Sequence, residues 1–387
     1  MIPFNKPYLA GKEMEYMRQA VLSGKISCNG VFTKGCEAFL EKKYGFKRAL
    51  LTTSCTHALE MAALLLDIKP GDEVILPSFA YVSDANAFAL RGATLVFADS
   101  CANDPNIDPG HIEKLITQKT KAILVVHYAG VACDMDAIML IVKKHKLFVI
   151  EDAAHAIDAY YKDRPLGSIG HIAAFSFHET KNIISGEGGM LVINDERFIE
   201  RAETLREKGT NRQAFLRGQV NKYEWVGLGS SWMPSELTAA YLAGQLENLD
   251  QIQKKRREIW NLYSTLLSPL KIHGFEPCTP AVSAKHNAHI FYLMCRSAEE
   301  RSRLIDHLGE KGILAVFHYQ PLHTSPYFVN HSSGRPLLPN TERYANCLLR
   351  LPLFYELEEA QVKHICTAIL DFYRGIELLG VKNKSGA

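Results

Sequence analysis

Seven short apolar segments recur through the first half of this chain, and patterns typical of helices separate them. Short strands that alternate with helices form βαβ units, in which helices cover both faces of a largely parallel sheet. The alternation therefore predicts an α/β fold with one large, mostly parallel sheet. We expect its strands at Ala49–Thr53, Glu73–Leu76, Thr94–Ala98, Ala122–Val126, Leu147–Ile150, Ile172–Phe177 and Met190–Ile193.

The rest of the chain alternates in the same way but has fewer apolar segments. We expect a boundary near Gln245, with a large domain of residues 1–245 and a smaller α/β domain of residues 246–387. Two helices, Ser235–Leu249 and Gln251–Leu267, should lie around this boundary. In the smaller domain we expect strands at His289–Met294 and Leu314–Tyr319, and helices at Glu299–Gly312 and Glu358–Tyr373.

Composition limits the classes of function. With 47% hydrophobic residues, 22% charged residues and a formal net charge of +2, the chain has no broad basic field for nucleic acid or an anionic membrane. We find neither a secretion signal nor an apolar run of membrane-spanning length, so we expect a cytoplasmic protein. The nine cysteines form no Cys-x-x-Cys pair, which argues against a disulfide framework and against a zinc site. We expect reduced thiols and no bound metal.

Polar residues follow several of the predicted strands. In open α/β sheets, ligands bind beyond the carboxyl ends of the strands, so these residues should meet in one crevice. The segments concerned are Ser54-Cys55-Thr56, Pro77-Ser-Phe-Ala-Tyr81, His127-Tyr128, Glu151-Asp152 and Ser176.

Lys181 lies in the segment Phe175–Gly189, between an apolar strand and a glycine-rich loop. A lysine taken alone is usually a solvated surface charge. An amine can form a Schiff base with an aldehyde cofactor only when it is partly deprotonated, which requires a desolvated site. The neighbours of Lys181 must therefore decide between these two interpretations.

Pyridoxal phosphate makes demands that other parts of the chain could meet. Its phosphate needs hydroxyl and N–H groups at a helix N-terminus, which Ser54 to Thr56 could supply, although either residue could be only a helix cap. Its pyridine nitrogen needs a carboxylate such as Asp152, which could also be a helix cap. Its ring needs an aromatic face, for which Phe79 and Tyr81 are candidates. Aromatic residues usually lie in the hydrophobic core, however, and either residue could do so here.

Three motifs combine in this chain: Glu151-Asp152-Ala-Ala-His155, Ser176-Phe-His-Glu-Thr-Lys181-Asn182 and Gly186-Glu-Gly-Gly. Together they resemble the DegT/DnrJ/StrS-type sugar aminotransferases, which are pyridoxal phosphate enzymes of fold type I. The resemblance implies that Lys181 is the Schiff-base lysine and proton shuttle, and that Asp152 is the partner of the pyridine nitrogen. It also implies cofactor contacts from His155 at the phenolic oxygen, from Tyr81 on the ring, and from Cys55, Thr56 and Ser176 at the phosphate.

Within this family, the segments His127–Met135, Arg217–Tyr223 and Phe317–His323 resemble those of enzymes that aminate C4 of dTDP-4-dehydro-6-deoxyglucose. The resemblance implies glutamate as the amino donor and a product used in surface polysaccharide. It places His318, Tyr319 and His323 in the sugar-nucleotide cleft, with Lys25 and Asn29 as weaker candidates. A structural histidine cluster is the alternative for the first group.

The resemblance also implies a homodimer with active sites shared between subunits. Many relatives have an asparagine that reaches across the dimer to the phosphate, and this chain has Ser231 at that position. A serine side chain is shorter than an asparagine side chain, so the sequence leaves open whether Ser231 makes this contact with the phosphate.

Two other functions remain compatible with the sequence. One is amination at C3 of a dTDP-linked 3-keto-6-deoxyhexose, which only contacts to the sugar would distinguish. The other is a non-enzymatic regulator that binds the cofactor or a nucleotide sugar, and it predicts an added helix-turn-helix or basic segment that we do not find. Arg212 and Arg217 could meet a donor carboxylate or could be solvated loop charges.

Overall fold

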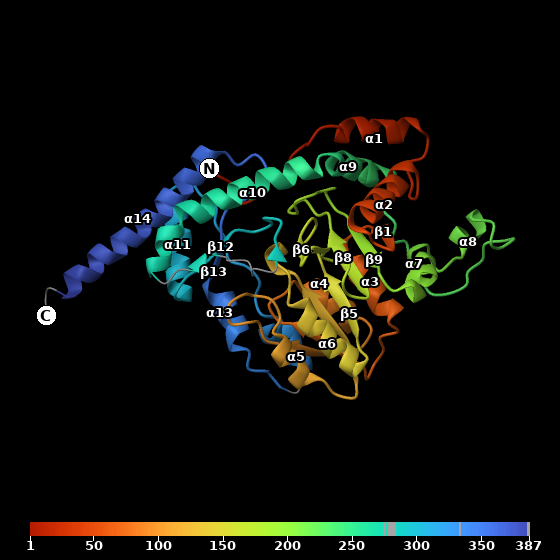
Figure 1. The fold of residues 1–387 in the computed structure, drawn as a ribbon, viewed down its shortest axis with the longest axis horizontal. Helices are drawn as coiled ribbons and strands as arrows, with labels where there is room; N and C mark the ends of the chain where they lie inside the picture. The colour runs from red at the N-terminus through yellow and green to blue at the C-terminus, as the bar shows by residue number, and fades with distance from the viewer. Residues whose placement is uncertain (274–275, 278–283, 333, 385–387) are drawn as a thin grey trace.

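The computed structural model describes residues 1–273, 276–277, 284–332 and 334–384. Its centre is a seven-stranded sheet in the order β1-β9-β8-β5-β4-β2-β3, with helices on both faces (Figure 1). All seven predicted strands are present, and they are β1 Arg48–Thr52, β2 Glu73–Pro77, β3 Thr94–Ala98, β4 Thr120–Val126, β5 Phe148–Asp152, β8 Ile172–Ser176 and β9 Gly189–Ile193. The mostly parallel α/β fold is therefore confirmed.

Only β9 runs against its neighbours, because a tight loop returns the chain directly from β8 to the adjacent position between β8 and β1. The carboxyl ends of the other strands consequently share one edge of the sheet.

Both faces of the sheet are buried, which explains why its strands read as continuous apolar runs. Adjacent residues on a strand point to opposite faces. Leu51 packs in one core cluster, whereas Leu50 packs in the other. The helices around this sheet are α1 Glu13–Leu22, α2 Val31–Tyr44, α3 Cys55–Leu65, α4 Val82–Ala89, α5 Pro109–Leu115, α6 Met135–His145, α7 Ile199–Arg206 and α9 Glu236–Glu247.

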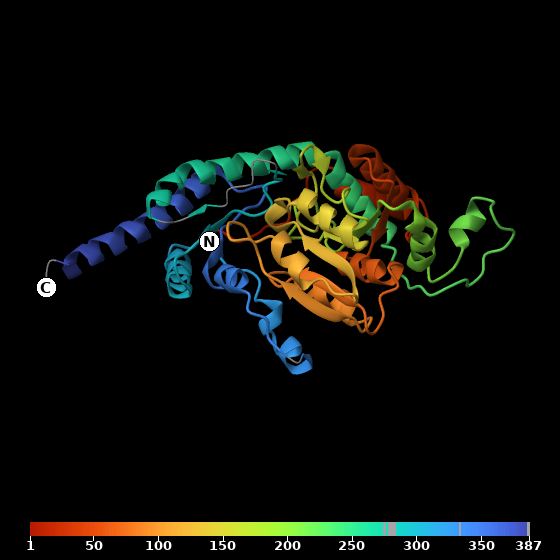
Figure 2. The same ribbon diagram turned by 60° about the horizontal axis from the view of Figure 1, so that its bottom comes forward.

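The C-terminal part is built around a third apolar cluster, which includes Trp260, Phe291 and Leu304. Its helices are α10 Leu249–Leu266, α11 Ala298–Glu310, α12 Pro326–His331, α13 Pro339–Cys347 and α14 Glu359–Lys384. Its sheet has the order β10-β12-β13, with β10 Glu276–Pro277, β12 Tyr292–Met294 and β13 Leu348–Arg350. A second small sheet joins β6 Tyr160–Tyr161 to β7 Arg164–Pro165 and β11 Ala284–Lys285. In Figures 1 and 2, α14 runs beside α10 and extends beyond the body.

Two strand predictions in this part need correction. The predicted strand Leu314–Tyr319 is wrong: Val316 makes a single bridge to Arg350, and the chain then leaves the sheet to line a cavity. The predicted strand from His289 is present only in its last residues, because preceding carbonyls are occupied elsewhere. The carbonyls of Ala288 and His289 accept hydrogen bonds from Arg256, at 3.2 and 2.8 Å.

Only Asn248 separates α9 from α10, so helical chain runs almost without interruption through the predicted boundary at Gln245. The division into residues 1–245 and 246–387 stays a prediction. In the described ranges, the chain has no helix with the length and apolar character needed to span a bilayer.

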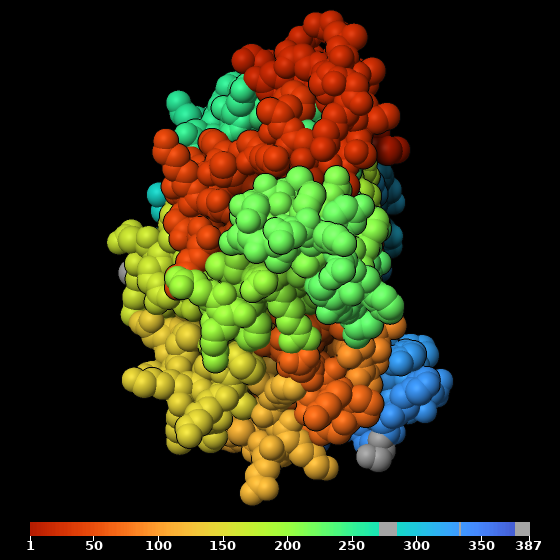
Figure 3. Space-filling view, turned by 90° about the vertical axis from the view of Figure 1, so that its right-hand side faces the viewer, coloured from red at the N-terminus to blue at the C-terminus, as the bar shows by residue number. Residues whose placement is uncertain are grey.

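A segment of residues 207–232, which we call the arm, projects from the body and carries the short helix α8 Arg212–Leu216 (Figure 1). Figure 3 faces the arm, drawn in green below the red N-terminal helices.

Candidate active site

A cavity of about 780 Å³ opens at the carboxyl edge of the large sheet, where the segment after Val316 covers it. The predicted crevice is therefore present. The residues singled out from the sequence that line it are Ser54, Cys55, Thr56, Tyr81, Asp152, His155, Ser176, Lys181, His318 and Tyr319.

Lys181 is held on a closely bonded loop between β8 and β9. The Phe177 N–H donates to the Gly188 carbonyl at 2.8 Å, and the Lys181 N–H donates to the His178 carbonyl at 2.9 Å. Burial lowers the pKa of the Lys181 amine, while the nearby Asp152 carboxylate acts in the opposite direction. The fold thus gives Lys181 the desolvated environment that Schiff-base formation requires.

Asn182 fixes the position of this loop against the C-terminal part. Its amide donates to the Gln253 side chain on α10 and to the Asn287 carbonyl, both at 2.8 Å. Its oxygen lies 2.8 Å from Nδ1 of His289, a ring that lines the cavity. The residue next to the candidate catalytic lysine is therefore bonded to parts of the chain that are distant in sequence.

The N-terminus of α3 opens into the cavity and could hold a phosphate group. Ser54 is its N-cap, because its hydroxyl accepts from the His57 N–H at 3.1 Å. The Thr56 hydroxyl lies 2.8 Å from that of Ser83 on α4. A side chain at Gly189 would lie 2.3 Å from the backbone of Ser54, so only glycine lets β9 pass this close to the phosphate cradle.

Asp152 ends β5 inside the cavity. Its carboxylate accepts from the Ala154 N–H at 2.8 Å, and the Cys55 thiol lies 4.0 Å away. The preceding residue, Glu151, points to the opposite side of the sheet. It accepts from the N–H groups of Gly167 and Ile169, both at 2.8 Å, and from the His127 ring at 2.9 Å. The prediction that His127 and Glu151 share the crevice is therefore wrong, because neighbours on a strand face opposite ways.

His155 presents a defined ring nitrogen to the cavity. The Ala129 N–H donates to its Nδ1 at 3.3 Å, so the proton of the neutral ring is on Nε2. Burial, followed by the charges of Lys181 and Arg350, holds the pKa of His155 well below its usual range. His155 is therefore a neutral hydrogen-bond donor at this site.

His318 and Tyr319 cover the other side of the cavity. The Tyr128 hydroxyl lies 2.6 Å from Nδ1 of His318, and the His318 and Tyr319 rings are stacked with centroids 3.6 Å apart. Burial lowers the pKa of His318 and raises the pKa of Tyr319, so both side chains are neutral. Tyr81 lines the cavity and is 58% exposed, whereas Phe79, the other aromatic candidate, is fully buried beneath Tyr128.

Four of the predicted site residues do not line the cavity of this chain. His323 is fully buried, with Nδ1 2.7 Å from the Ser78 hydroxyl and Nε2 3.3 Å from Glu342. Both ring nitrogens of His323 thus have polar partners within the protein, as the alternative of a structural histidine cluster expects. Lys25 and Asn29 lie in the loop before α2, and Ser231 is exposed on the arm.

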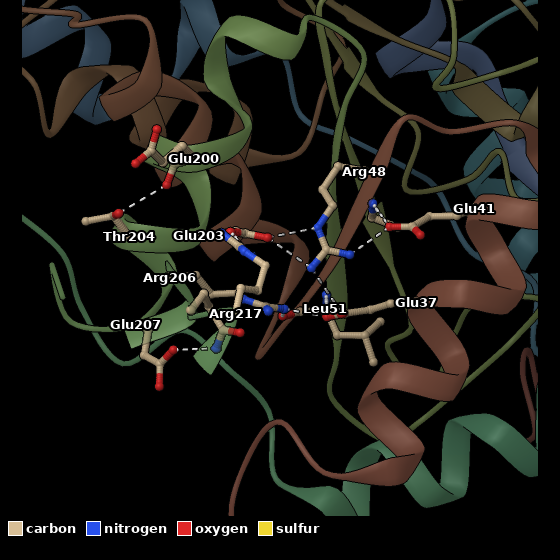
Figure 4. A network of polar contacts seen from close by, with 12 residues as sticks. Glu37, Glu41, Arg48, Leu51, Glu200, Glu203, Thr204, Arg206, Glu207 and Arg217 are labelled. Carbon is tan, nitrogen blue, oxygen red and sulfur yellow. Dashed lines mark hydrogen bonds and ion pairs between the residues drawn. The ribbon is translucent and has the colours of Figure 1, made fainter. Parts of the chain in front are cut away.

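Arg212 and Arg217 are also outside the cavity. Arg217 pairs with Glu203 at 2.8 Å (Figure 4). Arg212 pairs with Glu207 at 2.9 Å. These pairs belong to a polar network at the free edge of β1. Glu37 accepts from the Leu51 N–H at 3.0 Å and from the buried Arg206.

Two charged residues of the cavity were missed by sequence reasoning. Asp84 is fully buried in the first turn of α4, where an acidic residue looks like an ordinary helix-start residue. Arg350 ends β13 and lines the cavity, and its Nε has no hydrogen-bond partner among the described residues. No local signal distinguishes Arg350 from a surface arginine, because its burial depends on contacts with segments far away in sequence.

Comparison with known proteins identifies relatives over almost the whole chain. The pattern of the DegT/DnrJ/EryC1/StrS aminotransferase family matches residues 7–370. The spore coat polysaccharide biosynthesis protein SpsC of Bacillus subtilis (strain 168) is 36% identical over 97% of this chain and 98% of that protein. GDP-perosamine synthase of Escherichia coli O157:H7 is 33% identical over 96% of this chain and 98% of that protein.

Solved structures show the same fold. Spr1654 of Streptococcus pneumoniae, provisionally described as a sugar aminotransferase, is 26% identical to this chain. Its PMP form has a TM-score of 0.90 and covers 97% of this chain and 100% of that chain. Its PLP form has a TM-score of 0.89 and covers 97% of this chain and 99% of that chain.

Proposed function

The chain belongs to the DegT/DnrJ/EryC1/StrS aminotransferase family, and we propose on that premise that it transfers an amino group from glutamate to C4 of dTDP-4-dehydro-6-deoxyglucose. The product is dTDP-4-amino-4,6-dideoxygalactose, for use in surface polysaccharide. The protein is a pyridoxal phosphate-dependent sugar aminotransferase. The proposal therefore concerns the sugar, the carbon atom, the nucleotide and the donor.

The observation that carries the proposal is the desolvated Lys181 amine, which shares one cavity with the Asp152 carboxylate and the N-terminus of α3. When bound, pyridoxal phosphate supplies an aldehyde carbon that bonds to amines and a ring that withdraws electrons from the adjoining carbon. The residues present fit this group: a lysine for the aldehyde, a carboxylate for the ring nitrogen and a helix N-terminus for the phosphate.

We assign Lys181 two tasks. Because burial lowers the pKa of its amine, a neutral fraction is available to bond to the cofactor, and the same amine can accept and return the proton at the substrate carbon. Delivery of that proton from one fixed side would set the configuration of the new amine.

The other cofactor contacts are assigned to residues around this amine. Cys55, Thr56 and Ser176 hold the phosphate together with the N–H groups of α3. With the cofactor bound, the Nε2–H of His155 would donate to the phenolic oxygen, and Tyr81 would lie against the ring.

Arg350 supports a donor with a carboxylate. It places a partly buried cation in the cavity, whereas Arg212 and Arg217 are already paired with glutamates. Glutamate fits this cation because an arginine can bind a carboxylate with two parallel hydrogen bonds.

His318 and Tyr319 are assigned to the sugar, since both line the cavity with neutral polar groups that suit hydroxyl and carbonyl partners. The names of the relatives support a polysaccharide precursor, because SpsC is named for spore coat polysaccharide biosynthesis. The other relative is named for a GDP-linked product, so GDP sugars belong in the test beside dTDP sugars.

We also propose a homodimer with shared active sites. The arm exposes Trp225 at 79%, Leu228 at 68% and Val226 at 54%, which is an apolar surface suited to burial against a second subunit. In such a dimer Lys25, Asn29 and Ser231 would serve the partner's cavity rather than their own. Light scattering of the purified protein tests this: a monomer in solution would contradict it.

The test of the function is direct product analysis. Purified protein is incubated with pyridoxal phosphate and glutamate, and separately with dTDP-4-dehydro-6-deoxyglucose, its 3-keto isomer and a GDP-linked 4-keto-6-deoxyhexose. Mass spectrometry and NMR then identify the amino sugar and its configuration.

A 4-amino sugar with the galacto configuration is the expected result. A 3-amino product would move the specificity and leave the assignment of Lys181 in place. Bound cofactor without turnover of any sugar would favour the non-enzymatic regulator.

A further inference from the structure

Asp84 is a buried acid for which the proposed function has no task. It is fully buried on α4 and lines the cavity beside Asp152. Neither of its carboxyl oxygens makes a hydrogen bond of ordinary geometry with any residue in the described ranges, although the Tyr81 N–H lies near enough to favour the charged form slightly. A buried carboxylate without donors costs several kcal/mol, so an ionised Asp84 would be strongly unfavourable.

The groups around Asp84 decide which acid of the pair is charged. Asp84 and Asp152 line the same cavity, and the Asp152 side chain raises the pKa of Asp84 through its charge and a hydrogen-bond interaction. Neighbouring like charges disfavour the state in which both acids are ionised. Asp152 already accepts from the Ala154 N–H and faces the Cys55 thiol, so it is the better site for the charge.

The other titratable groups that face Asp84 do not reverse this order. Lys181 on the β8–β9 loop favours ionisation, but burial and the Asp152 charge outweigh it and raise the pKa of Asp84 well above its usual range. Cys55 on α3 and Tyr319 are neutral because burial raises the pKa of both.

We propose that Asp84 is a positioning residue for the cofactor, whose protonated carboxyl donates a hydrogen bond to the Asp152 carboxylate and thereby orients it and limits its charge. This inference rests on the proposed function in one respect, that Asp152 faces the pyridine nitrogen. A single negative charge, carried by Asp152 with Asp84 as its donor, then faces the ring. With the donor removed, Asp152 holds its charge more tightly and stabilises positive charge on the cofactor more strongly.

The first measurement concerns the protonation of Asp84 itself and needs no turnover. An infrared difference spectrum at neutral pH between the parent holoenzyme and an Asp84→Asn variant should contain the C=O band of one protonated carboxyl. A carboxylate band in its place would overturn the proposal. Asp104→Asn is the matched control, since Asp104 is a partly buried carboxyl outside the cavity.

The second measurement concerns the effect on the cofactor. The visible absorption of cofactor bound at Lys181 is titrated with pH in the parent, in Asp84→Asn and in Asp84→Ala. The Asn variant replaces one neutral donor by another, so its midpoint should lie within about 0.3 pH unit of the parent, whereas Asp84→Ala should move it upward by about 0.5 unit or more. The Ala variant should also bind pyridoxal phosphate more weakly in a fluorescence titration.

Two outcomes would count against the inference and one against its premise. A downward shift of about one unit in Asp84→Asn would mean that Asp84 is charged in the parent. An unchanged midpoint and affinity in Asp84→Ala would mean that Asp84 does not act on Asp152. If the parent bound no cofactor at Lys181, the proposed function would fail, and the infrared result would still decide the protonation of Asp84.

Discussion

Two clusters of charged residues lie at different places around the large sheet and differ in how completely they are paired. At the free edge of β1, Glu37 and Glu203 are bonded to arginines, and the edge N–H of Leu51 is bonded to Glu37 (Figure 4). In the cavity, Asp84 and Arg350 each retain polar atoms without a partner among the described residues. Acidic residues and arginines are thus almost fully paired in one cluster and incompletely paired in the other.

The completeness of pairing indicates which of the two clusters is structural. Buried polar groups are normally hydrogen-bonded, so the edge network satisfies a general rule: it covers an exposed strand edge and ties the arm to the body. The cavity violates that rule and retains the cost of desolvation, which a ligand can later offset. One imperfection of the network is Nε of Arg206, which has no partner in the described part of the chain.

The largest effect should come from the cavity. Lys181→Ala should lower kcat by about 10³-fold or more, because the variant loses both the covalent and the proton-transfer role of the amine. Circular dichroism should show an intact fold, since the loop is held by backbone bonds. Lys119→Ala, at an exposed lysine, is the control. Near-normal turnover in Lys181→Ala would refute the assignment.

The edge network should respond through stability instead. Arg206→Met should cost about 3–5 kcal/mol in the free energy of unfolding measured with urea, because it leaves Glu37 buried without its cation. Adding Glu37→Gln should recover part of that loss, since glutamine still offers an oxygen to the Leu51 N–H.

A control for this pair is Arg18→Met, which breaks an exposed ion pair with Glu15 at 2.9 Å and should cost much less stability than Arg206→Met, because solvent screens the exposed pair. Equal losses in Arg206→Met and Arg18→Met would show that burial does not distinguish the network.

Substitution of one arginine from each cluster compares their effects on donor binding. Arg350→Met should raise KM for glutamate by about 10–100-fold, the equivalent of one or two hydrogen bonds to a charged group. Arg217→Met should leave that KM unchanged, because its guanidinium is bonded to Glu203 outside the cavity. Steady-state kinetics on both variants decides the point, and the reverse result would restore the arm as the donor site.

The smallest effect concerns pH. Because burial raises the pKa of Asp84 above its unfolded value of about 3.9, folding takes up a proton, and stability falls as pH rises above about 4. Asp84→Asn removes this dependence. The variant and the parent should therefore unfold alike near pH 4, while at pH 7 the variant should be more stable by about 1–3 kcal/mol.

Thermal melts of the cofactor-free protein at both pH values measure this difference. The opposite sign is expected for Asp136→Asn, since the Lys162 ammonium lowers the pKa of Asp136 and its stabilising effect is present above the unfolded pKa. A loss of stability at pH 7 in Asp84→Asn would show a charged, stabilising Asp84.

Much of the site could be predicted from the chain because its motifs are local. Asp152 and Ser176 end strands β5 and β8, Lys181 lies on the loop that follows β8, and the strands themselves show as apolar runs. The errors arose where contacts distant in sequence decide the outcome. The chain after Leu314 has strand-like composition, yet it leaves the sheet to cover the cavity, and His323 is fixed by Ser78 from the other part of the molecule.

The seven-stranded sheet, the edge at which polar residues gather and the presence of Lys181 at that edge could be inferred from the sequence, because hydrophobic periodicity and chain direction are local properties. The meeting of particular charges depends on the tertiary structure. Asp84 lies beside Asp152, and Arg350 enters the same cavity, although all three are far apart in the chain. Burial and pairing of charge depend on packing between distant segments, and no local pattern of residues encodes them.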